Sequence, residues 1–310
     1  MYEAFYKLSN APFNLTPDPK YLVATRRHDE ALATLYYGIR SHKGFVVLTG
    51  EVGTGKTLLL RCLLHLLTES EDIAYAYVFN SNLSTTEFLQ YVLSDFGLPV
   101  EGRNKGELLR DLGKFLVARG SKHQTTALII DEAHSLPEEL LEEIRILSNL
   151  ETTDDKLLQI VLVGQPELEE KLDSVNLRQL KQRVALRARL YPLSFEEMEK
   201  YVGHRLQVAG ANSTPRRLFP AETLASIYRY SQGFPRLINT LCENALITAY
   251  ARKLESVTPQ IIAEVADEFR LETSSPHATD EEGNHYESVS TESLEELLKQ
   301  DGLLAYRKLP

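Results

Sequence analysis

Between residues 44 and 193 the chain alternates short apolar runs with longer segments of helical spacing. The runs are nearly continuous and rich in β-branched residues, which is typical of strands buried on both faces of a parallel sheet. They cover 45–50, 73–79, 127–131, 158–164 and the stretch through ARLYPL that ends at Leu193. The segments between them are long enough for crossover helices. The pattern predicts an α/β fold with a parallel five-stranded sheet and flanking helices.

One of the crossover helices is especially clear. In LPEELLEEIRILSNLE an apolar stripe follows a proline that suits the start of a helix. The stripe consists of Leu140, Leu141, Ile144 and Leu147, and the proline is Pro137.

After Pro192 the strand pattern ends and four segments with helical spacing follow, within 194–210, 220–233, 235–253 and 258–270. Ser194 and Thr258 are suitable N-caps, and Gly210 and Gly233 are suitable helix ends. A small all-helical domain is therefore predicted to follow the sheet.

The last forty residues differ in composition from the rest. Residues 272–290 are polar, acidic and poor in apolar side chains, which indicates a disordered linker. Residues 291–310 then contain a short amphipathic pattern formed by Leu294, Leu297 and Leu298. We expect a short helix there that docks on a partner; the alternative is that it folds back on the protein or stays disordered.

Composition limits the possible environments. The two cysteines, Cys62 and Cys242, lie in apolar helical patterns, which favours a reducing compartment and excludes a disulfide framework. No signal peptide pattern and no run of 18 apolar residues occur, so we expect no direct membrane insertion.

The net charge of −10 is concentrated at the carboxyl end. Residues 271–310 hold nine acidic and three basic residues, whereas residues 1–270 hold 35 acidic and 31 basic ones. The near-neutral core gives no general electrostatic reason to bind DNA.

A phosphate-binding loop is predicted between the first strand and the following helix. The segment matches G-x-x-x-x-G-K-[ST], with a lysine for the terminal phosphates and a threonine hydroxyl for Mg²⁺. Its residues are Gly50, Glu51, Val52, Gly53, Thr54, Gly55, Lys56 and Thr57. The alternative, a glycine turn that only links strand to helix, is disfavoured by this strand and helix context.

A pair of carboxylates follows the third apolar run. Asp131 at a strand end can hold the Mg²⁺ shell through water, and Glu132 can polarise an attacking water. The pair thus predicts ATP hydrolysis as well as binding; the alternative is an acidic strand end followed by a helix cap. The letters D-E-A-H at 131–134 also match a helicase signature, but the chain has no second domain of the kind such helicases need.

Gln165 follows the fourth run, in LVGQPEL. A polar side chain at this strand end would lie between the carboxylates and the terminal phosphate, where it could orient water. A simple turn before Pro166 explains the residue equally well.

Together these motifs resemble AAA+ ATPases, P-loop NTPases with a helical lid. APFNLTPDPKYLVATRRHDEALATLYYGI, GFVVLTGEVGTGKT and LVGQPEL are similar to the general secretion pathway protein A (ExeA-like) family over residues 4–270. Larger members continue into a transmembrane helix and a periplasmic peptidoglycan-binding domain. Because neither pattern occurs here, we expect a short form without a wall-binding role.

The resemblance implies a domain order. It is an N-terminal segment near the nucleotide (1–43), the ATPase core (44–193), the helical lid (194–271), the linker (272–290) and the terminal helix and tail (291–310).

It also implies roles for single residues. Arg236, in GFPR, matches the lid arginine called sensor 2, and Gln165 matches sensor 1. Tyr21 and Leu22 match the segment near the adenine.

Arg183 matches the arginine finger, which acts on ATP held by a neighbouring subunit, so the resemblance implies an ATP-dependent homo-oligomer, either a ring or a filament. The alternative is an ion pair with a carboxylate on its own helix. Arg187 and Arg189 are expected on one sheet face, opposite Leu186 and Leu190.

The function that the resemblance implies is ATP-driven assembly or regulation of a membrane-associated secretion, export or protein-sorting system. We expect a bacterial cytoplasmic protein that reaches the inner membrane only through a membrane protein partner.

Two other functions are alternatives. A DNA-binding regulator that resembles transposition target-selection ATPases would need a basic surface made by Arg103, Lys105, Arg110, Arg178 and Lys181. A slow nucleotide switch is disfavoured by Glu132.

Overall fold

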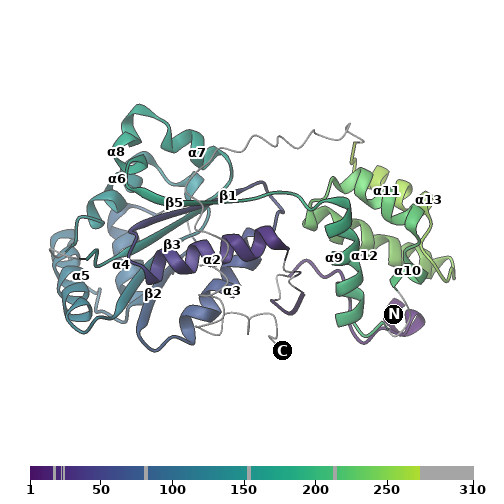
Figure 1. Ribbon diagram of the computed structural model, residues 1–310, viewed down its shortest axis with the longest axis horizontal. Helices are drawn as coiled ribbons and strands as arrows, with labels where there is room; N and C mark the ends of the chain where they lie inside the picture. The colour runs from purple at the N-terminus through teal and green to yellow at the C-terminus, as the bar shows by residue number, and fades with distance from the viewer. Residues whose placement is uncertain are drawn as a thin grey trace.

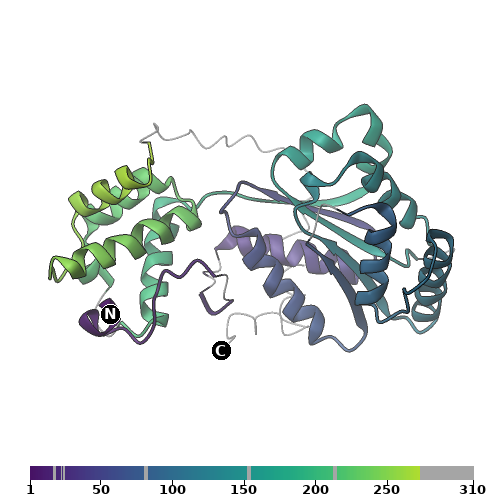
Figure 2. The ribbon, with the colours of Figure 1, turned by 180° about the vertical axis from the view of Figure 1, so that it is seen from behind.

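The computed structural model describes residues 1–272 apart from 17, 18, 22, 24, 80–82, 152–154 and 212–214. Figure 1 shows two parts, a sheet with helices around it and a separate group of helices. Figure 2, from behind, shows two described segments that cross between them, the connection from the sheet into the helical part and an N-terminal segment coloured purple.

The sheet has the predicted five parallel strands. They are β1 (Phe45–Gly50), β2 (Ile73–Val78), β3 (Thr125–Ile130), β4 (Gln159–Gly164) and β5 (Val184–Leu190), in the order β2-β3-β4-β1-β5. Every residue of β1, β3 and β4 is buried, which explains their unbroken apolar runs. The predicted fold class is confirmed.

The last strand ends earlier than predicted. β5 stops at Leu190, and the chain from Tyr191 to Leu193 leaves the sheet to enter the helical part. Pro192 has no N–H to donate to a neighbouring strand, which suits this exit. A register shift near the start of β5 moves its partner from Phe45↔Val184 to Val46↔Leu186.

Two layers of helices cover the sheet. On one face, α2 (Arg26–Arg40) and α3 (Lys56–Thr68) pack against side chains such as Leu48 and Ile129. On the other, α4, α5, α6, α7 and α8 pack against side chains such as Val47 and Ile130. Their bounds are Thr85–Asp95, Lys105–Gly120, Glu138–Leu147, Glu167–Leu172 and Arg178–Lys181, with short 3₁₀ turns η2 (Ala133–Ser135) and η3 (Val175–Leu177).

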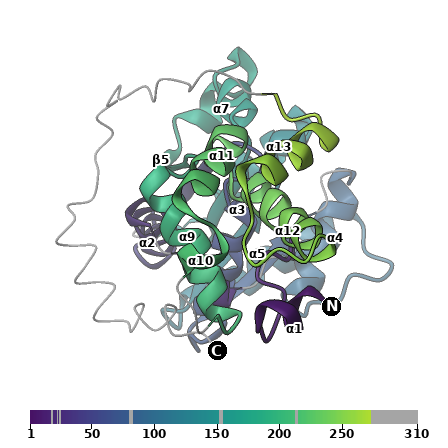
Figure 3. The ribbon, with the colours of Figure 1, turned by 90° about the vertical axis from the view of Figure 1, so that its right-hand side faces the viewer.

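The helical part comprises α9 (Phe195–Val208), α10 (Pro215–Leu218), α11 (Ala221–Ser231), α12 (Pro235–Ala251) and α13 (Pro259–Glu268). Ser194 forms a capping box with Glu197, and the Thr258 hydroxyl accepts from the N–H of Ile261. Gly210 and Gly233 follow helix ends with positive φ angles. The predicted helical domain is therefore present, with α10 in addition. From the end of the molecule, α9, α11, α12 and α13 lie in front of the sheet (Figure 3).

The expected N-terminal segment 1–43 is divided in the structure. Helix α1 (Tyr2–Tyr6) and the residues after it pack into the core of the helical part, where Tyr6 and Phe13 are buried. Helix α2, by contrast, belongs to the sheet layers. The 3₁₀ turn η1 (Pro19–Tyr21) lies between these two regions.

The carboxyl end is mostly outside the described residues. This includes the predicted linker beyond Glu272 and the predicted terminal helix with Leu294, Leu297 and Leu298. No helix within the described part of the chain is both long enough and apolar enough to span a bilayer.

Candidate nucleotide site

The predicted phosphate-binding loop connects β1 to α3. Gly53 (φ +84) and Gly55 (φ +104) adopt conformations that L side chains rarely allow. The Thr54 hydroxyl donates to the carbonyl of Glu51 (2.8 Å) and so closes the loop on itself. The loop leads directly into the amino terminus of α3, a helix of 13 residues. Backbone N–H groups and the helix dipole favour an anion at this position.

Lys56 is the first residue of α3 and is 7% exposed. Its Nζ donates to the carbonyls of Gly50 (2.6 Å) and Glu51 (3.0 Å). Burial lowers the pKa of the Lys56 ammonium, while Glu132 and Asp131 act in the opposite direction. Its bonds to loop carbonyls are ones that phosphate oxygens can replace.

Asp131 and Glu132 follow β3 directly. Asp131 is 5% exposed; Oδ1 accepts the N–H of Glu132 (2.9 Å), and Oδ2 accepts the hydroxyl of Tyr77 (3.2 Å). Burial raises the pKa of the Asp131 carboxyl. Glu132 has a left-handed backbone (φ +53), and Oε2 of its partly exposed side chain lies 3.4 Å from Nδ1 of His134.

The residues present fit Mg²⁺. Thr57 lies exposed in the first turn of α3, and Asp131 lies at the same edge of the sheet, so the protein offers oxygen ligands of the kind this ion prefers. Among the described residues no group of three His, Cys, Asp or Glu could hold a metal. Two protein oxygens suit an ion that is shared with phosphates and water.

Gln165 follows β4, which lies between β3 and β1, so it is placed between the carboxylates and the phosphate-binding loop. Its backbone N–H donates to Nδ1 of His134 (3.4 Å). His134 is thereby in contact with both Glu132 and Gln165.

The helical part reaches the loop through the start of α12. The backbone N–H of Arg236 donates to the carbonyl of Gly53 (3.3 Å). A Cβ on Gly53 would lie 2.9 Å from Cβ of Arg236, so this approach requires glycine. Arg236 is thus held directly above the loop.

Tyr21, expected near the adenine, is buried in η1 with its ring centroid 4.6 Å from the guanidinium of Arg205 on α9. The turn η1 contacts both α9 and α3. Leu22 lies outside the described residues.

Arg183 lies at the opposite end of the sheet, where the strands begin. The next residue, Val184, pairs with Phe45 at the start of β1, whereas the loop follows Gly50 at its end. Nη1 donates to Oγ of Ser148 (2.6 Å) and Nη2 to Oδ1 of Asn149 (2.6 Å). Arg183 therefore bonds to neutral groups on its own chain, far from its own loop.

The other arginines of β5 are explained separately. Arg187 forms an ion pair with Glu169, and the guanidinium of Arg189 lies 5.2 Å from the ring centroid of Tyr191. Leu186 and Leu190 pack on the opposite face, with α2, as predicted.

Of the basic residues that a DNA surface would need, three are paired with acids. Arg103 pairs with Asp111 (3.4 Å), Lys105 with Glu143 (2.7 Å) and Lys181 with Asp173 (2.6 Å).

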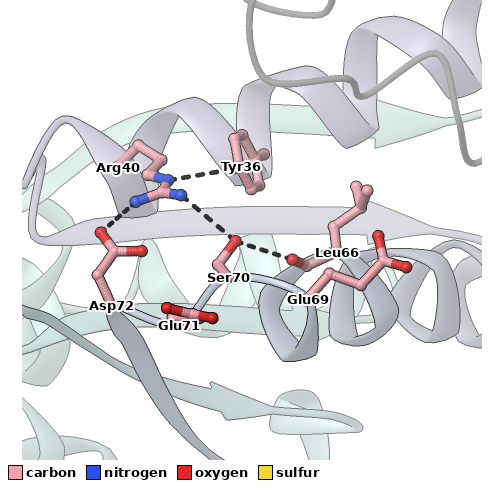
Figure 4. A pocket seen from close by; sticks show the side chains of 7 residues that line it. All are labelled: Tyr36, Arg40, Leu66, Glu69, Ser70, Glu71 and Asp72. Atoms are coloured by element: carbon pink, nitrogen blue, oxygen red, sulfur yellow. Dashed lines mark hydrogen bonds and ion pairs between the residues drawn. The ribbon is translucent and has the colours of Figure 1, made fainter.

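A separate hollow of about 360 Å³ lies between the end of α2, the end of α3 and the start of β2, and Figure 4 shows its side chains. Arg40 donates to the hydroxyls of Tyr36 (3.0 Å) and Ser70 (3.3 Å) and pairs with Asp72. The charge of Arg40 is already compensated by Asp72, and the hollow lies at the amino ends of the strands, away from the loop. We interpret the hollow as a structural junction.

Sequence reasoning missed several residues at the nucleotide edge. Tyr77, His134 and His28, which is buried and bonded to the backbone of Thr54 in the loop, belong to no phosphate-site motif. His134 is the last residue of the D-E-A-H letters, which match the signature of another class of protein.

The fold and the site define a P-loop protein of the AAA class. A family model described as an AAA domain matches residues 39–172. Solved structures share the fold. The Aeropyrum pernix ORC2 protein in its ADPNP-ADP complexes has a TM-score of 0.63 and 20% identity, over 84% of this chain and 72% of that one. Drosophila ORC bound to DNA has a TM-score of 0.64 and 18% identity, over 87% and 66%. At these identities the likeness concerns the fold alone.

The particular resemblance drawn from the sequence is confirmed. The chain is 45% identical over 253 residues to general secretion pathway protein A of Aeromonas hydrophila. The match covers 81% of this chain and 45% of the relative, so the chain spans less than half of that protein's length. The chain is an AAA+ protein, and its sequence is similar to the part of that secretion protein that it matches.

Proposed function

We propose that this protein binds and hydrolyses ATP with Mg²⁺, and that it works as a homo-oligomer. The observation that carries the proposal is the meeting of three elements at one sheet edge. The phosphate-binding loop with Lys56, the carboxylates Asp131 and Glu132, and the lid residue Arg236 come together there. A glycine turn without a phosphate role would explain neither the carboxylates nor Arg236 at this place.

The chain's own residues have distinct tasks in this proposal. The loop N–H groups and Lys56 bind the phosphates, and Arg236 approaches them from the lid. Glu132 accepts a proton from the attacking water. Thr57, and Asp131 through water, would hold Mg²⁺, which when bound would supply positive charge to neutralise the phosphate oxygens. Gln165 orients the water.

Substitution of Glu132 tests hydrolysis. We expect Glu132→Gln to bind ATP as the wild type does and to hydrolyse it about 10² to 10⁴ times more slowly. Glu139→Gln, which removes an exposed carboxylate on α6, is the matched control and should retain full activity. If Glu132→Gln kept wild-type turnover, Glu132 would not be the base.

The place of Arg183 supports action on a neighbouring subunit, since an arginine at the far edge of the sheet cannot reach its own loop. Arg183→Ala should lose turnover and keep ATP binding, and Lys56→Ala should lose binding. Mixed together, the two variants should regain part of the activity, because one supplies the pocket and the other the arginine. A mixture as inactive as its components would exclude a finger in trans.

We further propose a cytoplasmic role in powering or regulating a membrane-associated secretion, export or sorting assembly, with an inner-membrane protein as partner. The similarity to a secretion pathway protein supports this. Pull-downs with and without residues 273–310 test whether the terminal region carries the partner contact. ATPase assays with double-stranded DNA at two salt concentrations test the alternative: stimulation that collapses at high salt would favour DNA.

A further inference from the structure

Tyr77 lies one step from the metal carboxylate because of the strand register. Tyr77 pairs with Ile129, and the N–H of Asp131 continues the ladder by donating to the carbonyl of Val78 (2.8 Å). Side chains alternate along strands, so Tyr77, Ile129 and Asp131 share one face of the sheet. This is the face covered by α3, the helix that begins at the phosphate-binding loop.

The hydroxyl of Tyr77 completes the bonding of Asp131. One carboxylate oxygen accepts the N–H of Glu132 and the other accepts the Tyr77 hydroxyl (3.2 Å). The Lys56 ammonium is bonded to loop carbonyls instead. Within the described part of the chain, Tyr77 is the one side chain that donates a hydrogen bond to Asp131. With one donor on each oxygen the carboxylate has a fixed rotation, and its remaining lone pairs stay available to metal-bound water.

Tyr77 is held both at its backbone and at its ring. Its backbone N–H donates to Oδ2 of Asp95 (2.9 Å), which fixes the outer side of this edge strand to the end of α4. Its ring lies 6.0 Å from that of Phe79, which in turn packs edge-on against Tyr91 at 6.1 Å. A hydroxyl on a ring held in this way has little freedom to leave Asp131.

We propose that Tyr77 is a positioning residue of the nucleotide site, whose hydroxyl orients Asp131 for Mg²⁺ while touching neither metal nor nucleotide. The inference rests on the proposed ATP site and adds a residue to it. Hydrogen-bond partners of metal-binding carboxylates typically change metal affinity about 10- to 100-fold when removed. Tyr77 should therefore affect the Mg²⁺ dependence of binding and leave metal-free binding intact.

Tyr77→Phe tests this, with Tyr91→Phe as the matched control. Each substitution removes one hydroxyl from the packed rings of Tyr77, Phe79 and Tyr91. The Tyr91 hydroxyl forms no hydrogen bond with another described residue. The measurement is equilibrium binding of a fluorescent ATP analogue to the full chain, in EDTA and over a MgCl₂ titration. A thermal melt of each variant checks the fold.

We expect Tyr77→Phe to raise the Mg²⁺ concentration for half-maximal enhancement of binding about tenfold, with affinity in EDTA unchanged. Tyr91→Phe should match the wild type in both. An unchanged Mg²⁺ midpoint in Tyr77→Phe, or an equal loss of affinity with and without Mg²⁺, would overturn the role of Tyr77 alone. A wild-type protein that binds no ATP analogue under either condition would overturn the proposed function, and this inference with it.

Discussion

At Gly233 the helical lid lies directly against the chain that leaves the sheet. It lies between α11 and α12 with φ +79, and its carbonyl accepts the N–H of Leu193 (2.8 Å). A Cβ there would lie 2.0 Å from the carbonyl oxygen of Leu193. Because the opposing atom is backbone, it cannot move aside as a flexible side chain does. Gly233→Ala should therefore separate the lid from this connection.

The size of the effect has two parts. An L residue in a left-handed conformation costs about 1–2 kcal/mol. Opening the contact adds about 1 kcal/mol for the hydrogen bond and about 1–2 kcal/mol for partial exposure of Leu193, which is 3% exposed in the structure. The expected loss of unfolding free energy is roughly 3–5 kcal/mol.

Gly97→Ala is the matched control. Gly97 also has a positive φ (+74), but no atom lies within 4 Å of a Cβ placed there. It should lose only the conformational part, about 1–2 kcal/mol. Urea unfolding of both variants measures the difference. ATP binding should also weaken in Gly233→Ala, because the lid carries the contact between Arg236 and Gly53. Equal destabilisation by the two substitutions would refute the argument from the close approach.

Three further outcomes are expected. Gly53→Ala should weaken ATP binding at least about tenfold while unfolding at a urea concentration close to that of Gly97→Ala, because its Cβ would displace Arg236 without entering a core. Arg205→Lys should lose about 2–4 kcal/mol of stability and expose the N-terminal segment to protease, because one ammonium cannot replace guanidinium bonds to the carbonyls of Pro12 (2.7 Å) and Asn14 (3.1 Å). Burial lowers the pKa of His28, so the unfolded chain binds a proton at this residue more readily than the folded chain does. The contribution of His28 to stability should be complete above about pH 6.5 and fall as the pH drops towards the folded pKa. Thermal melts of His28→Gln should show a weaker fall with pH than those of the wild type. A wild-type melting temperature that is flat from pH 7.5 to 5.5 would contradict the last expectation.

The parts of the fold that were predictable depend on local sequence. Strands buried on both faces leave unbroken apolar runs, and caps such as Ser194 use short-range side-chain bonds, so both can be recognised along the chain. The end of β5 was less predictable, because Tyr191 and Leu193 are as apolar as strand residues. What separates them from the sheet is the path into the lid, which depends on contacts such as that with Gly233.

The site divides in the same way. The phosphate-binding loop could be recognised because its residues keep a fixed spacing within one strand-loop-helix unit. Asp131 could be recognised because it directly follows a buried apolar strand. Tyr77 reaches Asp131 only through the register between β2 and β3, which no local pattern specifies. The burial of α1 in the lid is of the same kind, since five residues carry too little pattern to identify a distant core.

Because all five strands run in the same direction, the number of complete sites should depend on the number of subunits in an assembly. The proposed ATP site lies at the carboxyl ends of the strands and Arg183 at the amino end of β5, so each molecule has two unlike ends. If Arg183 serves the next molecule, contacts run head to tail, and an open row always has one terminal pocket without an arginine. A dimer would then have one complete site for two chains, a row of six would have five, and a closed ring would have as many as it has chains. Turnover per chain would thus report the length of the assembly, and rise with protein concentration before any partner is added.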